Sequence, residues 1–116
     1  MDRVFKAFFN SIAAWRHLIR AEKAFQQEVA LLALALLLGY FVAYDARSYV
    51  MLVGSIVLII IVEVLNTAIE AACDAFSREF HADIKIAKDC GSLAVLLSIL
   101  LAAAVWSVAL WERVSG

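Results

Sequence analysis

The feature that most constrains this chain is a run of apolar residues, Gly91 to Trp111, that contains no charged side chain. Its length is close to the ~20 residues that a helix needs to cross about 30 Å of hydrocarbon. Two more apolar stretches, Val29 to Tyr44 and Ser48 to about Ala72, precede it. The chain contains no proline and no strand-like alternation of apolar and polar residues. The spans are therefore predicted to be helices and not strands of a barrel.

Composition supports the same class of protein. Hydrophobic residues make up 66% of the 116 residues, well above the roughly half that is usual in soluble domains. We expect a single-domain, all-α integral membrane protein over residues 1–116, with an N-terminal amphipathic interfacial helix and three transmembrane helices. The expected bounds are 1–27 for the surface helix, 29–45 for the first span, 48–75 for the second span with a cytoplasmic extension, and 88–112 for the third.

The N-terminal segment has apolar residues at helical spacing and no uninterrupted apolar core, so it does not resemble a signal peptide. At 100° per residue, one arc of the predicted helix collects Val4, Phe5, Phe8, Phe9, Ile12, Trp15 and Ile19. This pattern is typical of a helix that lies in the membrane interface.

The basic residues predict the orientation. If the N-terminus and the polar loop after the second span share one side, that side carries Arg3, Lys6, Arg16, Arg20, Lys23, Arg78, Lys85 and Lys88, and only Arg47 and Arg113 lie opposite. The richer side is expected to be cytoplasmic. Trp106 and Trp111, with Tyr40 and Tyr44, are typical of an aromatic belt at the far interface. A net charge of −1 and the absence of a basic run argue against nucleic acid as a partner.

The second span continues without a break into EVLNTAIEAACD, which carries a polar stripe. In a helix, Glu63, Asn66, Glu70 and Asp74 fall within an arc of about 80°. A carboxylate in lipid costs ~2.5 to 3.5 kcal/mol even on the gentlest scale, so the stripe must face protein, water or cations. Glu63 is the deepest member.

Further charged residues stand near the same membrane surface. Lys88 and Asp89 enter the third span, while Glu22 and Glu28 flank the start of the first. Carboxylates from different helices can converge there, and such oxygen-rich clusters suit Mg²⁺, which also binds substrate phosphates. There is no glycine-rich phosphate loop, so a nucleotide would depend on the metal, Lys88 and the basic surface helix.

Each of these residues also has a simpler interpretation. Glu63 could form a helix–helix hydrogen bond or serve as the proton site of a transporter. Lys88 could be an anchor that reaches the interface and pairs with Asp89. Solvation or ordinary pairing would explain Asp74, Glu79, Asp83, His17 and His81.

Three segments together, EVLNTAIEAACD, AKDCGS and EKAFQQE (Glu22 to Glu28), resemble the prokaryotic diacylglycerol kinase family. The resemblance covers nearly the whole chain. It implies a homotrimeric bundle of three-span subunits in the bacterial cytoplasmic (inner) membrane, with shared active sites at the cytoplasmic face. Such an enzyme transfers the γ-phosphate of ATP to the hydroxyl of a membrane lipid.

The same resemblance implies roles for the motif residues. Glu63 is expected to act as the general base and Asn66 to help position the reactants. Lys88 is expected to contact phosphate oxygens, and Asp89 to orient that lysine or the nucleotide.

The resemblance also implies binding residues. Glu22 and Glu70 are expected to hold the Mg²⁺ that bridges the nucleotide phosphates. Further contacts are expected from Arg3, Asn10, Glu79, Phe80 and His81 with ATP, and from Glu28, Glu63 and Ser92 with the lipid.

The segment EKAFQQE favours diacylglycerol over undecaprenol as the acceptor. Two residues depart from the expected pattern: Phe80 stands where tyrosine is expected, and Lys23 adds a charge beside Glu22. The alternatives are an undecaprenol kinase and, from a different class, a non-enzymatic membrane subunit or a proton-coupled transporter.

Overall fold

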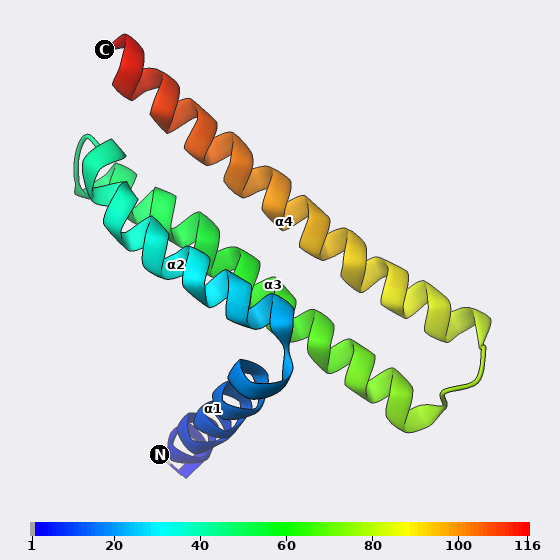
Figure 1. The fold of residues 1–116 in the computed structure, drawn as a ribbon. Coiled ribbons are helices and arrows are strands. Elements are labelled where there is room, and N and C mark those ends of the chain that lie inside the picture. Colours follow the sequence, from blue (N-terminus) through cyan, green and yellow to red (C-terminus); the bar gives the residue numbers. More distant parts are fainter. Residues whose placement is uncertain (1) are drawn as a thin grey trace.

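The computed structural model describes residues 2–116, and four helices account for nearly all of them (Figure 1). They are α1 (Asp2–Ala21), α2 (Lys23–Val42), α3 (Ala46–Phe76) and α4 (Ala82–Ser115). The last three are each long and apolar enough to cross a membrane. The prediction of an all-α membrane protein with an N-terminal helix and three spans is confirmed.

The three long helices run side by side, and α1 leaves them at an angle (Figure 1). Helix α4 packs mainly on α3 and barely touches α2. Both α3 and α4 continue past the start of α2, so the loop between them extends beyond the α1–α2 corner (Figure 1). On α1, an exposed apolar face is formed by Val4, Phe5, Phe8 and Phe9.

A sharp corner at Glu22 separates α1 from α2. Glu22 has an extended backbone, with φ −106° and ψ 110°. The Gln26 side-chain amide donates to the Ile19 carbonyl at 2.9 Å, which satisfies one of the free carbonyls at the end of α1. Trp15 meets Phe25 edge to face, with ring centroids 5.1 Å apart, and only 1% of Phe25 is exposed. The corner is thus held by packing and a capping bond, without glycine or proline.

The turn between α2 and α3 depends on Asp45. Its carboxylate accepts from the Ser48 N–H at 2.9 Å, and its own N–H donates to Ser48 Oγ at 3.1 Å. This reciprocal cap satisfies backbone donors that the first turn of α3 would otherwise leave free. The bond from the Ser48 backbone, followed by that from its hydroxyl, lowers the pKa of Asp45 below its usual value.

A small apolar core joins the three long helices. Its buried members are Ala35, Ile56, Ile59 and Ala102, with Leu32 and Trp106 packed against them. The Trp106 indole N–H also donates to the Leu52 carbonyl at 3.1 Å. Trp106 therefore takes part in the α3–α4 contact, and its place in an interfacial aromatic belt stays a prediction.

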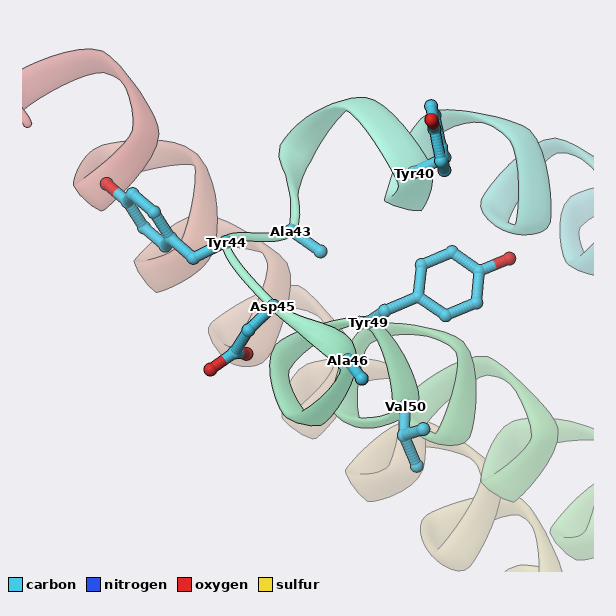
Figure 2. Close-up of a pocket in the computed structure, with 7 residues that line it drawn as sticks. All are labelled: Tyr40, Ala43, Tyr44, Asp45, Ala46, Tyr49 and Val50. Carbon is cyan, nitrogen blue, oxygen red and sulfur yellow. The ribbon is translucent and has the colours of Figure 1, made fainter.

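A cavity of about 440 Å³ lies at the α2–α3 turn, the end of the bundle opposite the α3–α4 loop (Figures 1 and 2). Figure 2 shows that its tyrosines point in different directions and do not converge. The Tyr49 hydroxyl donates to the Leu36 carbonyl at 2.8 Å, and the Tyr44 hydroxyl donates to the Glu112 carbonyl. Because these polar groups already bond neighbouring helices, this cavity is part of the helix packing.

Candidate active site

The polar stripe of α3 runs from the interior of the bundle to its surface. Glu63 and Asn66 are buried, each with 8% of its surface exposed, whereas Glu70 is exposed and Asp74 is half-buried. The Asn66 amide donates to Glu70 Oε1 at 2.8 Å. A hydrogen bond thus links the buried and exposed parts of the stripe, and its deepest carboxylate is Glu63.

Gly91 on α4 makes room for Asn66. A Cβ built on Gly91 would collide with Asn66 Oδ1 and would lie 3.1 Å from its Cγ. The same Oδ1 is buried and accepts no hydrogen bond within residues 2–116. The glycine of the AKDCGS segment thus permits the close approach of α4 that covers the stripe. The sequence interpretation missed this contact.

A second carboxylate accompanies Glu63. Glu28 on α2 is half-buried, and its Oε2 has no hydrogen-bond partner in the described part of the chain. The negative charges of Glu28 and Glu63 are close enough to repel each other. The charges of Glu22 and Glu70 also repel that of Glu63. Bound protons or cations would stabilise such a cluster, because like charges at short range oppose one another's ionisation.

A cavity of about 380 Å³ lies between the α1–α2 corner and α3. It is lined by His17, Glu22, Thr67, Glu70, Ala71, Asp74, Ala75 and Arg78. It therefore brings together Glu22 and Glu70, the two residues expected to hold the metal. We call it the metal-side cavity.

The donors of this cavity fit Mg²⁺ only in part. No group of three or more His, Cys, Asp or Glu side chains within residues 2–116 could hold a metal ion. Mg²⁺, however, commonly takes one or two protein carboxylates and completes its shell with water and substrate phosphates. Glu22 and Glu70 suit an ion that arrives with a nucleotide.

A second cavity, of about 420 Å³, lies at the α3–α4 loop and the start of α4. It is lined by Arg78, Glu79, Phe80, His81, Ile84, Lys85, Lys88 and Asp89. The five residues expected to contact ATP from this region therefore surround one space. We call it the loop-side cavity. Phe80 is 79% exposed, so its ring face is open to a flat ligand.

The charged residues of the loop-side cavity are paired in an unexpected way. Lys88 Nζ lies 2.9 Å from Asp74 Oδ1 on α3. Asp89 instead accepts from Lys85, one turn earlier on α4, at 2.6 Å. The interpretation that Lys88 pairs with Asp89 is wrong, because the neighbouring helix supplies the partner.

Three of the predicted contacts lie elsewhere. Arg3 and Asn10 are exposed on α1, and Ser92 is exposed on α4; none of them lines either cavity. Conversely, the cavities include residues that the sequence interpretation left out, namely His17, Thr67, Asp74, Arg78 and Lys85. Of these, only Asp74 had a signal in the sequence, because it continues the stripe.

Comparison with known proteins decides the family. A sequence model described as prokaryotic diacylglycerol kinase matches residues 9–110. The chain belongs to this family. The resemblance seen in the motifs is thereby confirmed.

Relatives named diacylglycerol kinase agree with this family. A diacylglycerol kinase of Escherichia coli K12 is 41% identical over 101 residues, 87% of this chain and 80% of the relative. One of Helicobacter pylori 26695 is 34% identical and covers 90% of this chain and 81% of the relative. A diacylglycerol kinase of Pseudomonas aeruginosa PAO1 is 31% identical, and the match covers 95% of this chain and 89% of the relative. Membership in a kinase family excludes the non-enzymatic subunit and the transporter.

Proposed function

We propose that this kinase transfers the γ-phosphate of ATP to the free hydroxyl of diacylglycerol, giving phosphatidic acid and ADP. The family and the names of the relatives support the reaction. The observation that carries the proposal is the stripe of α3, where buried Glu63 leads through Asn66 to Glu70 at the metal-side cavity.

In this reaction Glu63 takes the proton of the lipid hydroxyl while that oxygen attacks the γ-phosphorus. The bond from the γ-phosphorus to the bridging oxygen breaks, and ADP leaves with its electron pair. Glu28, with its buried unpartnered oxygen, supplies an acceptor for a second polar group of the lipid. Catalysis of this kind depends mainly on positioning and charge neutralisation.

The nucleotide is the other half of the site. Lys88 faces its phosphates, and Phe80 and His81 border its flat base. Glu22 and Glu70 would hold Mg²⁺, which would neutralise phosphate charge when bound. The carboxylate cluster around Glu63 supports this assignment, because a cation relieves the repulsion among its members.

The proposal includes a homotrimer in the bacterial inner membrane, with the α3–α4 loop and the N-terminus in the cytoplasm. The distribution of Lys and Arg supports the orientation. The exposure of Arg3 and Asn10 away from both cavities supports shared sites, in which α1 of one subunit completes the site of another. Ser92 would face the lipid in the same assembly.

An assay with two lipids tests the function. Purified protein is given labelled ATP, Mg²⁺ and either diacylglycerol or undecaprenol, with a magnesium-free control. Labelled phosphatidic acid as the main product, dependent on Mg²⁺, is the expected result. Undecaprenyl phosphate as the main product would overturn the choice of lipid and keep the kinase mechanism. Labelled lipid from neither would contradict the proposed reaction.

A further inference from the structure

The two cavities meet at one charged junction. Arg78 lines both of them, Asp74 lines the metal-side cavity, and Lys88 lines the loop-side cavity. A nucleotide that occupied both cavities would place its phosphates near these three side chains. This argument rests on the proposed function, because it takes ATP as the ligand that spans both spaces.

Asp74 contacts a cation with each of its carboxylate oxygens. Oδ1 accepts from Lys88 Nζ at 2.9 Å, and Oδ2 lies 3.7 Å from an Arg78 guanidinium nitrogen. One cation comes from α4 and the other from the loop that follows α3. The carboxylate thereby brings together two positive charges that would otherwise repel each other.

The junction differs from an ordinary surface ion pair. An exposed pair on one helix, such as Lys85 with Asp89, joins residues four apart that are already neighbours. The pair of Asp74 and Lys88 instead joins two helices and is partly shielded, with 33% and 41% of the side chains exposed. Lys88 has a flexible four-carbon stem, so a fixed partner is what gives its ammonium group one position.

The Arg78 guanidinium is held more loosely. Its side chain is 82% exposed and contacts Asp74 only at 3.7 Å. A guanidinium binds phosphate with two parallel hydrogen bonds, and phosphates carry more charge than one carboxylate. Arg78 can therefore turn toward a triphosphate without a large loss of protein contacts.

We propose that Asp74 is a positioning residue that holds Lys88 and Arg78 together at the junction, and that Arg78 contacts the nucleotide phosphates beside Lys88. Asp74 acts through the two cations and does not touch the reacting atoms. Arg78 adds a second positive charge where the phosphates cross from one cavity to the other.

The test compares Asp74→Asn, Asp74→Glu, Arg78→Gln and Arg78→Lys with the wild type. Asp83→Asn is the matched control, because it removes an exposed acid near the start of α4 that lines neither cavity. For each variant, kcat and KM are measured for MgATP and for diacylglycerol. Binding of Mg²⁺ with a non-hydrolysable ATP analogue is measured separately by calorimetry, with no lipid acceptor.

We expect Asp74→Asn and Arg78→Gln each to raise KM for MgATP and the Kd of the analogue by about five- to tenfold, the scale of one lost charged contact. KM for the lipid and the Tm should stay near wild type. Asp74→Glu and Arg78→Lys should recover part of the loss. The double variant, Asp74→Asn with Arg78→Gln, should raise the Kd of the analogue by less than the product of the two single effects, because the residues act as a unit.

Different results overturn different claims. The positioning role would be overturned if Asp74→Asn and Arg78→Gln both bound the analogue with a Kd within twofold of wild type. It would also be overturned if these variants impaired the KM for MgATP, the KM for the lipid and the Tm to the same degree. If Asp74→Asn fails to fold, Asp74→Glu and the Arg78 variants decide by the same binding measurement. A wild type that binds the analogue and phosphorylates neither lipid would reject the proposed function, while the Kd comparison would still decide the junction. A wild type that binds no nucleotide would overturn both.

Discussion

Glu63 is a buried acid, and the charged side chains that act on it within residues 2–116 are other acids. It is buried, and Glu28, Glu22 and Glu70 surround it with negative charge. A carboxylate kept for structure alone would be expected to have a cation or a donor beside it. Within residues 2–116, the side chain of Glu63 takes part in no hydrogen bond or ion pair. Its position suits a base that meets its partner only when substrate is bound.

We predict that Glu63→Gln folds and binds MgATP but transfers phosphate about 100- to 10,000-fold more slowly, the usual range for loss of a general base. The amide keeps the size of the side chain and cannot take the proton. The measurements are kcat with diacylglycerol and calorimetric binding of an ATP analogue. Near wild-type turnover would show that another group accepts the proton.

Gly91 offers a test of the packing around Asn66. Gly91→Ala should lower stability by about 1–3 kcal/mol, as overpacking of a filled site does, and should also lower kcat by displacing Asn66. The control is Gly54→Ala in α3, where an added Cβ meets nothing within 4 Å. That change should be neutral or slightly stabilising, since alanine favours a helix over glycine. Equal Tm values for both variants would contradict the packing argument.

At the scale of the helices, the three spans could be predicted from the sequence, because the length and hydrophobicity of a segment are enough to identify a membrane-spanning helix. The ends of the helices were harder to predict. The corner at Glu22 has no glycine or proline, and it depends on Gln26 and on the packing of Trp15 against Phe25. Such tertiary contacts leave no local pattern in the sequence. Helix α4 likewise begins at Ala82, well before the apolar run from Gly91.

The candidate site shows the same division. Helical spacing was enough to align Glu63, Asn66 and Glu70, and the resemblance supplied five of the eight residues that line the loop-side cavity. The partner of Lys88 was not predictable, because it depends on how α4 registers against α3. Arg78 was missed because a single exposed arginine in a loop has no distinguishing pattern.

The Asp45 cap gives a prediction for the α2–α3 turn. Because its pKa is lowered in the folded state from an ordinary 3.8, its charged form stabilises the fold fully above that value. This contribution is lost as the pH falls through the lowered pKa. Asp45→Ala should therefore reduce the Tm at pH 7, and the difference from wild type should narrow below about pH 4. Thermal unfolding in detergent between pH 7 and pH 3 measures this.

Asp45→Asn is the control for the cap, because it keeps an acceptor for the Ser48 N–H without a titrating group. Its Tm should fall less than that of Asp45→Ala at pH 7. A gap between wild type and Asp45→Ala that stays constant down to pH 3 would contradict the electrostatic part of the cap.

At the scale of the whole molecule, the chain encloses little of its own surface. Most of α4 is exposed, including Leu93, Leu96, Leu97 and Leu100. Some of this apolar surface faces lipid, and the rest is available to other subunits. Native mass spectrometry from detergent should show three copies of the 12.8 kDa chain, and activity should follow that species. A fully active monomer would contradict the shared site.

Helix α3 carries both Glu63 and Asp74 without interruption, which restricts how the chain can change in length. Inserting one residue between Glu63 and Asp74 would rotate everything beyond it by about 100° and shift it by ~1.5 Å. Asp74 would then turn away from Lys88 while Glu63 stayed in place. The short connections at 43–45 and 77–81 lie outside the helices, so a change in their length does not rotate one part of a helix against another. Insertions and deletions in relatives should therefore fall in those connections, and the spacing from Glu63 to Asp74 should stay constant.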